Sequence, residues 1–248
     1  MERNEAVDIT HKTSFCISST KSGGGKTMLT CGLIKSLRNR RYTVQSFKAG
    51  PDYIDPLFHD AVSEEEAGGL HNPKEGCENL DIYLAGYDGI REIFEERSRA
   101  ADISVIEGVM GLYDGIGADS SKYSTYDTAA ALSVPVILVP DAKGAMRSVV
   151  AMIKGFIDYD ASSLIKGVIL NRCSRSSAGL LSPVIEKELG IRCFGAVPEI
   201  RDIAVESRYL GLVLPDEAVD IKQKVDRLAS VMEESVDIDG IIEACSGI

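Results

Sequence analysis

The sequence predicts an α/β fold in which a mostly parallel sheet is flanked by helices. Short apolar runs alternate with longer segments whose apolar residues recur at helical spacing. A glycine-rich loop follows the first apolar run and precedes a helical segment. With 248 residues, 44% of them hydrophobic and 26% charged, the chain is long enough to bury a core without metals or disulfides.

Six short apolar runs are expected to form the strands, at residues 15–18, 43–48, 103–106, 136–139, 167–170 and 193–197. Helical spacing is clearest at residues 29–37, 180–189 and 225–232. Alternating strands and helices imply parallel pairing through right-handed crossovers. Ligands of such sheets bind beyond the carboxyl ends of the strands, so the functional loops are expected to follow the six runs.

The chain is expected to contain one main domain. Residues 1–12 form a polar tail, residues 13–235 the domain, and residues 236–248 either a last short helix or a linker to a further domain. The longest irregular segment is expected at residues 49–80. Its acidic part, residues 63–78, is interpreted either as a lid or as a disordered insertion.

Charge and composition exclude several function classes. The chain has 27 Lys and Arg against 38 Asp and Glu, a net charge of −11, which argues against non-specific binding of nucleic acid or anionic membranes. No apolar stretch reaches the length of about 18 residues that a transmembrane helix needs. The polar start is not a signal peptide, so a cytoplasmic location is expected. The six cysteines and three histidines show no metal-ligand spacing.

The loop after the first strand has the features of a phosphate-binding loop. Consecutive glycines let backbone N–H groups converge on phosphate oxygens, and the following helix adds its positive end. Lys26 is expected to reach the β- and γ-phosphates, and the hydroxyl of Thr27 to bind Mg²⁺. Thr20 replaces the leading glycine of the usual pattern; the alternative is a glycine-rich turn that binds nothing. The expected nucleotide contacts here are Lys21, Ser22, Gly23, Gly24, Gly25, Lys26, Thr27 and Met28.

Carboxylates follow the second and third strands, at the edge of the sheet where the phosphate-binding loop lies. Asp52 and Asp55 stand between two prolines, a pattern also typical of plain turns. Glu107 ends an apolar strand, as in a Walker B motif. Mg²⁺ bound to a nucleotide needs one or two protein carboxylates beside the threonine hydroxyl. The predicted metal ligands are Thr27, Asp52 and Glu107, and either Asp52 or Asp55 can supply the second carboxylate.

Three later residues are candidates for contacts with the base of the nucleotide. Asn171 and Arg172 follow the fifth strand, where an asparagine side chain can pair with an adenine edge. Pro198 follows the sixth strand, where the chain can close over the base. Asparagine and proline are also ordinary turn formers, so each signal is weak alone.

Several strings together resemble the cobyrinic acid a,c-diamide synthases and their relatives, which include the nickel sirohydrochlorin a,c-diamide synthases. The resemblance runs from about residue 15 to residue 214. It rests on the strings SGGGKT at 22–27, FKAGPDYIDP at 47–56, NLD at 79–81, EGVMGLYDG at 107–115, LNR at 170–172 and SRYLGL at 207–212. The resemblance implies a P-loop NTPase fold of the dethiobiotin synthetase kind.

The resemblance also implies a reaction. A peripheral carboxylate of a tetrapyrrole dicarboxylic acid attacks the γ-phosphate of ATP, and ammonia displaces the resulting acyl phosphate to give an amide. By resemblance, the catalytic residues are Lys26, Asp52, Asp55 and Glu107, with Mg²⁺ as the metal. By the same resemblance, Tyr53, Ile54 and Asp114 contact the macrocycle.

Members of this family usually carry a C-terminal glutaminase domain that supplies ammonia. The present sequence ends where that domain would begin, so the expected ammonia source is an absent domain, a separate subunit or free ammonia; a homodimer is an open option. Two alternatives remain. One is a nucleotide-switch ATPase like the partition and septum-site proteins, whose loops share a lysine at the place of Lys21. The other is a small-molecule ligase like dethiobiotin synthetase.

Overall fold

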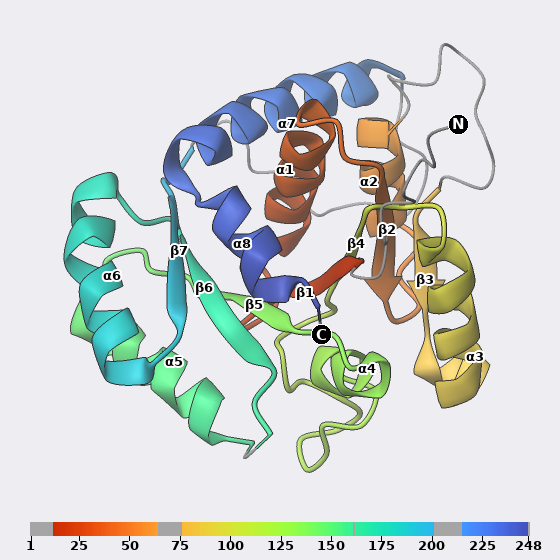
Figure 1. Cartoon of the computed structure of the whole chain (residues 1–248), viewed down its shortest axis with the longest axis horizontal. Helices are drawn as coiled ribbons and strands as arrows, with labels where there is room; N and C mark the ends of the chain where they lie inside the picture. The colour runs from red at the N-terminus through yellow and green to blue at the C-terminus, as the bar shows by residue number, and fades with distance from the viewer. Residues whose placement is uncertain (1–11, 64–75, 161, 201–214, 248) are drawn as a thin grey trace, which may run out of the picture.

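A computed structural model of the chain describes residues 12–63, 76–160, 162–200 and 215–247. These residues form seven strands in one sheet, and each neighbouring pair is parallel, in the order β3-β2-β4-β1-β5-β6-β7 (Figure 1). The strands are β1 (Thr13–Ser19), β2 (Val44–Ala49), β3 (Glu78–Leu80), β4 (Ile103–Glu107), β5 (Val136–Val139), β6 (Ile165–Asn171) and β7 (Arg192–Val197). The predicted fold class is confirmed.

Eight helices connect or follow the strands within the described ranges. They are α1 (Lys26–Asn39), α2 (Asp55–Ser63), α3 (Ile82–Ser98), α4 (Thr125–Leu132), α5 (Arg147–Asp158), α6 (Arg175–Leu189), α7 (Pro215–Ser235) and α8 (Ile238–Cys245). Several begin where a short polar side chain accepts a hydrogen bond from a free backbone N–H of the first turn. Asp81 caps α3, Ser124 caps α4, Ser174 caps α6 and Asp237 caps α8.

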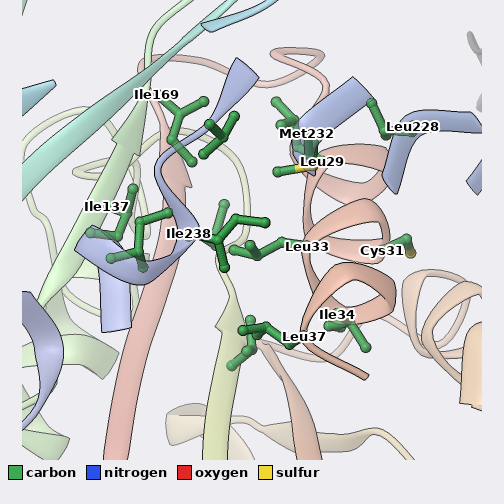
Figure 2. Close-up of a cluster of buried hydrophobic side chains, with 14 of the residues drawn as sticks. Leu29, Cys31, Leu33, Ile34, Leu37, Ile137, Ile169, Leu228, Met232 and Ile238 are labelled. Carbon is green, nitrogen blue, oxygen red and sulfur yellow. The ribbon is translucent and has the colours of Figure 1, made fainter. Parts of the chain in front are cut away.

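One face of the sheet is covered by α1, α2, α7 and α8. Alternate residues of β1 point to opposite faces, and Phe15 and Ile17 face this layer. In Figure 2, Leu29, Leu33 and Leu37 of α1 lie along one side of that helix, with side chains of α7 and α8 around them. Helix α7 packs along α1 and crosses above it in Figure 1. This packing holds α1, and with it the glycine-rich loop, against the sheet.

The other face is covered by helices α3 to α6. Cys16 of β1 points to this side, together with Ile106 of β4 and Leu138 of β5. Ile90 of α3 and Ile153 of α5 are fully buried against these strands. Central strands buried on both faces explain why the sequence shows continuous apolar runs there instead of alternation.

The segment at residues 49–80 is where the sequence-based expectation was wrong. It holds helix α2 and edge strand β3, both of which sequence reasoning assigned to irregular structure. Strand β3 is only three residues long, and α2 starts inside a proline-rich turn, so turn residues dominate the local pattern. The lid or insertion expected at 63–78 falls mainly on residues 64–75, which lie outside the described residues, as do residues 1–11 and the string at 207–212.

The C-terminal segment forms a helix and joins the main core. Ile238 and Ile241 of α8 are buried in the layer that also contains α1 and α7. Asp237 precedes this helix, and its backbone N–H donates to the carbonyl of Phe194 in β7, the edge strand. Residues Ile238–Cys245 are therefore helical and belong to the folded core.

Among the described residues, no helix is both long enough and apolar enough to cross a lipid bilayer.

Candidate active site

The loop between β1 and α1 is shaped by two glycines that cannot be replaced without a clash. A Cβ atom on Gly24 would lie 2.8 Å from the Ser19 hydroxyl oxygen. Gly25 has a φ of +81°, and a Cβ atom there would lie 2.7 Å from the Asn171 side-chain nitrogen. No side chain of the described residues caps the start of α1. The first N–H groups of α1 are therefore available to an anion, which the helix dipole also favours.

Lys26, the first residue of α1, folds back over this loop. Its Nζ lies 3.2 Å from the Ser19 Oγ and also donates to the Met110 carbonyl, in the loop after β4. Burial lowers the pKa of Lys26, and the negative charge of Glu107 partly offsets this effect. The side chain thus ties the glycine-rich loop to the loop after β4, with its charge directed to the anion-binding end of α1.

Three oxygen-bearing side chains from three different elements meet beside this lysine. The Thr27 hydroxyl donates to Glu107 Oε1 at 2.7 Å and lies 3.2 Å from Asp55 Oδ1. Thr27 comes from α1, Asp55 is the first residue of α2, and Glu107 is the last residue of β4. A hydroxyl and two carboxylates next to a helix N-terminus are the donor set that Mg²⁺ takes beside a nucleotide, so the residues present fit that ion.

Lys48 completes this cluster, and sequence analysis did not identify it. Its Nζ lies 3.0 Å from Glu107 Oε1 and 3.2 Å from the Gly108 carbonyl oxygen, and it also pairs with Asp55. Burial lowers the pKa of Lys48, but the two carboxylates outweigh burial and raise the pKa above its usual range. The available signal was a lysine inside an expected strand of the sheet, because a lysine that is buried there needs a counter-charge.

The charges of the cluster set its protonation states. Burial raises the pKa of Glu107, but the contacts with Lys48 and His59 outweigh it and hold the pKa at about 2. Burial and the neighbouring charge of Glu107 raise the pKa of Asp55 to about 6, against the opposing effect of Lys48. Glu107 is therefore ionised at neutral pH, and Asp55 is the carboxyl that titrates nearest to neutrality.

His59 is a second residue that sequence analysis missed. It lies one turn after Asp55 on α2, is fully buried, and places its Nε2 2.6 Å from Glu107 Oε2. Its Nδ1 lies 3.3 Å from the Cys77 Sγ. Burial lowers the pKa of His59, but the contacts with Cys77 and Glu107 outweigh burial and raise it to about 10.

Asp52 takes a different position from Asp55. Its Oδ1 accepts the backbone N–H of Ile54 at 2.9 Å, and its carbonyl accepts a hydrogen bond from the Asn79 side chain at 3.0 Å. Asp52 therefore shapes the turn that leads into α2, while Asp55 reaches Thr27. The Tyr53 and Ile54 side chains point outward from this turn and are 73% and 44% exposed.

Residues at the end of β6 support the phosphate-binding loop. The Asn171 side-chain amide donates to the Gly24 carbonyl at 2.8 Å. Arg172 forms an ion pair with Asp141, whose Oδ2 also lies 3.6 Å from Lys21 Nζ. In this structure the amide of Asn171 thus holds the loop itself, and Lys21, 61% exposed, lies on its outer side.

The remaining predicted nucleotide residues are spread around the loop. Ser22 and Gly23 are exposed at its tip. Met28 is half-buried and packs against the core layer of α1, α7 and α8. Pro198 is half-buried directly after β7, separated from the loop by β5 and β6 in the sheet order.

An apolar cavity of about 330 Å³ opens next to the cluster, at the carboxyl ends of β2, β3 and β4. Large apolar side chains on its walls are unusually exposed, namely Tyr83, Leu84, Met110 and Ile116. Asp114 also lines it, and its Oδ2 accepts the backbone N–H of Gly111 at 2.8 Å. The cavity and the carboxylate cluster share the loop that follows β4.

Residues 15–211 match a family model described as the CobQ/CobB/MinD/ParA nucleotide binding domain. The chain belongs to this family. The matched range includes the glycine-rich loop, the cluster of Lys48, Asp55 and Glu107, and the Asn171 that supports the loop.

Solved structures agree with this nucleotide-binding family at the level of the fold. The MinC:MinD cell division complex of Aquifex aeolicus aligns with a TM-score of 0.52 at 17% identity, over 94% of both chains. FtsY of Mycoplasma mycoides aligns with a TM-score of 0.50 at 14% identity, over 94% of this chain and 70% of that chain. At these identities the likeness extends to the fold alone.

Curated relatives share much more sequence. A cobyrinate a,c-diamide synthase of Clostridium tetani is 37% identical over 230 residues, which are 93% of this chain and 49% of the relative. One of Archaeoglobus fulgidus is 39% identical over 228 residues, 92% of this chain and 47% of the relative. The predicted resemblance to this group is confirmed. The chain spans about half the length of the curated relatives it matches.

Proposed function

We propose that this chain is the ATP-dependent synthetase part of an enzyme that converts peripheral carboxylates of a corrinoid or related tetrapyrrole into amides. The observation that carries the proposal is the junction between two sites. A phosphate-binding loop with a Thr27–Asp55–Glu107 cluster lies directly beside an apolar cavity. Curated relatives named cobyrinate a,c-diamide synthase, which match over nearly the whole chain, support a corrinoid carboxylate as the substrate.

In the proposal, ATP binds with its phosphates over the glycine-rich loop. The N–H groups at the start of α1 and the ammonium of Lys26 receive phosphate oxygens, and they stabilise the charge that develops during phosphoryl transfer. Lys21, Ser22, Gly23, Gly25 and Met28 complete the predicted loop contacts. Asn171 holds the loop through Gly24, and Arg172 and Pro198 remain the proposed contacts with the base of the nucleotide.

Thr27, Asp55 and Glu107 are the side chains that would hold Mg²⁺. When bound, the ion neutralises phosphate charge and orients the nucleotide. The structure favours Asp55 over Asp52 as the second carboxylate, because Asp55 lies within hydrogen-bond distance of Thr27 and Asp52 is engaged in the preceding turn. Lys48 balances the carboxylates with its own charge.

The apolar cavity is the proposed place of the macrocycle. Its exposed Tyr83, Leu84 and Ile116 offer an apolar surface to a flat ring, and Tyr53 and Ile54 stand exposed at the neighbouring turn. Asp114 fixes the loop through Gly111 and faces the cavity, where it can accept a hydrogen bond from a substrate side chain. A peripheral carboxylate of a ring held here is directed toward the phosphate-binding loop.

The proposed reaction has two steps. A carboxylate oxygen of the substrate forms a bond to the γ-phosphorus as the bond to the β,γ-bridging oxygen breaks, which gives an acyl phosphate and ADP. Ammonia then attacks the acyl carbon, phosphate leaves, and the ammonia nitrogen loses a proton to give the amide. The ammonia comes from a glutaminase domain or subunit, or from solution.

A coupled assay tests this proposal. The chain is incubated with Mg-ATP, excess ammonium and either cobyrinic acid or a nickel sirohydrochlorin, and the macrocycle is analysed by mass spectrometry. We expect replacement of hydroxyl by amino groups, together with release of phosphate. Lys26→Ala is expected to abolish product formation. The control Lys154→Ala, which removes an exposed lysine on α5, is expected to leave it unchanged.

Binding of ATP without product from either acid would overturn the proposed substrate. The remaining candidates would then be a nucleotide-switch ATPase and a small-molecule ligase. Measurement of ATP-driven dimerisation would test the first. Absence of ATP binding would overturn the proposal at its first step.

A further inference from the structure

His59 lies at the centre of a chain of buried contacts that ends at the proposed metal-nucleotide site. The imidazole is fully buried. Its Nδ1 lies 3.3 Å from the Cys77 Sγ, just before edge strand β3, and its Nε2 lies 2.6 Å from Glu107 Oε2 at the end of β4. Both ring nitrogens are thus engaged, which fixes the orientation of the ring.

The two oxygens of Glu107 have different partners. Oε1 accepts from the Thr27 hydroxyl at 2.7 Å and lies 3.0 Å from Lys48 Nζ. Oε2 faces His59. A buried carboxylate with a donor on each oxygen cannot rotate without losing a hydrogen bond, which costs the desolvation of a charged group. The imidazole therefore holds one oxygen of Glu107 and fixes the plane of the carboxylate, so that the other oxygen faces Thr27.

His59 comes from helix α2, which also supplies Asp55, a member of the cluster. Asp55 and His59 are four residues apart, a spacing that places both side chains on one side of a helix. Three residues further, Val62 is buried in the apolar core and fixes the far end of α2 against the layer that contains α1. The helix is thus positioned independently of the cluster, and His59 transmits that position to Glu107.

We propose that His59 is a positioning residue, which orients the Glu107 carboxylate so that Oε1 faces Thr27 and the metal-nucleotide site. The proposal rests on the proposed function above, since it assigns Glu107 to Mg²⁺. It goes further, because His59 touches neither substrate nor nucleotide and acts through Glu107. Residues that orient a metal ligand in this way typically change metal affinity by about 10-fold to 100-fold when they are replaced.

A purely structural histidine would affect stability but not the dependence of nucleotide affinity on the metal. The informative quantity is therefore the ratio between the Kd for ATP in EDTA and the Kd for ATP with saturating Mg²⁺. Calorimetry or a fluorescent ATP analogue measures both constants without turnover. Thermal unfolding of each variant shows separately how much stability it has lost.

Two substitutions of His59 separate the hydrogen bond from the bulk of the ring. His59→Gln carries an amide nitrogen at about the distance of Nε2 and can still donate to Glu107. His59→Asn is one methylene shorter and cannot reach it. We expect His59→Asn to reduce the metal-dependent ratio by about 10-fold or more, with the Kd for metal-free ATP changed less than twofold. His59→Gln loses the charge of the ring equally but keeps a donor, so it is expected to retain clearly more of the ratio than His59→Asn.

Val62→Ala is the matched control. It loosens the same helix by removing buried methyl groups, and it leaves the contact between His59 and Glu107 in place. We expect it to lower the melting temperature while keeping the wild-type ratio. If His59→Asn does not fold, His59→Leu replaces it, because leucine fills a similar volume and has no donor; the proposal requires this variant to lose the ratio as well.

The outcomes separate this proposal from the proposed function. A wild-type chain whose ATP affinity does not respond to Mg²⁺ would overturn both. A wild type that responds, with His59→Asn responding equally, would overturn the role of His59 alone. The role of His59 would also be overturned if Val62→Ala lost as much of the ratio as His59→Asn. The same conclusion would follow if His59→Gln lost as much of the ratio, because this variant retains a donor.

Discussion

Lys48 and Glu107 are directly paired in the register of two neighbouring parallel strands, β2 and β4, and their side chains form a buried ion pair. The Lys48 Nζ lies 3.0 Å from Glu107 Oε1, and both side chains are almost completely shielded from solvent. Because the pairing is fixed by the sheet, the Lys48–Glu107 ion pair is assembled as soon as the strands are in register. A buried cation thus neutralises the carboxylates proposed to bind Mg²⁺, in the state without the ion.

Removal of this cation is expected to destabilise the fold strongly. Lys48→Met leaves Glu107 and Asp55 buried without their shared counter-charge, a change that typically costs about 3–5 kcal/mol. Urea unfolding at neutral pH in EDTA measures the loss. The control Lys154→Met removes an exposed lysine of α5 and is expected to change stability by less than about 0.5 kcal/mol. Equal effects of the two substitutions would contradict this account of the cluster.

The pKa of Asp55 predicts a pH dependence of stability. Burial and the charge of Glu107 raise the pKa from 3.8 to about 6 in the folded chain. Between these values the folded state binds more protons than the unfolded state, so the contribution of Asp55 to stability is present below pH 4 and is lost as the pH rises through 6.

Comparison with Asp55→Asn isolates this effect, because the amide does not titrate. The stability of the wild type relative to the variant is expected to fall by on the order of 1–3 kcal/mol from pH 4 to pH 7. Chemical unfolding of both proteins in EDTA across this pH range is the measurement. A difference that stays constant or rises with pH would show that the pKa of Asp55 is not raised.

Gly108, directly after Glu107, is expected to tolerate no side chain. A Cβ atom there would lie 2.5 Å from the Thr125 Cγ2. The Thr125 hydroxyl is itself fixed, because it accepts the N–H of Val109 and donates to the Val109 carbonyl, both at 2.8 Å. Gly108→Ala therefore has to displace the loop and is expected to cost about 1–3 kcal/mol.

Gly155 of α5, in contrast to Gly108, is expected to accept a side chain, and the same unfolding assay measures this. A Cβ atom there meets nothing within 4 Å, so Gly155→Ala is expected to stabilise the chain by about 0.5–1 kcal/mol through helix propensity. Thermal unfolding should move the two melting temperatures in opposite directions. A neutral Gly108→Ala would show that the loop after β4 adapts freely.

Asp114 is expected to act on the macrocycle and not on the nucleotide. Asp114→Ala frees the Gly111 N–H and removes a polar group from the cavity, so the KM for the macrocycle is expected to rise by about 10-fold to 100-fold. Asp114→Asn keeps an oxygen acceptor and is expected to have a smaller effect. Steady-state kinetics and ATP binding measure the two quantities, and a loss of ATP affinity in Asp114→Ala would contradict the assignment.

Local sequence was sufficient for much of the fold and for the phosphate-binding loop. The loop spans contiguous residues, and each of its requirements, such as the αL conformation of Gly25 and the helix that starts at Lys26, depends on near neighbours. The buried strands were also readable, because both faces of a central parallel strand are apolar. Short β3 and proline-led α2 were missed, since three residues give no clear strand pattern and the Asp and Pro residues at the start of α2 are typical of turns.

The sequence by itself determined that a phosphate-binding loop, apolar strands and acidic strand ends would share one edge of a parallel sheet. Only the tertiary structure decided which of these side chains meet. Asp55 and not Asp52 reaches Thr27, because α2 begins at Asp55 and turns it toward α1. Lys48 and His59 joined the cluster through strand register and helix packing. Contacts of this kind join residues about 50 to 80 positions apart, and a buried charge requires a partner without specifying where in the chain that partner lies.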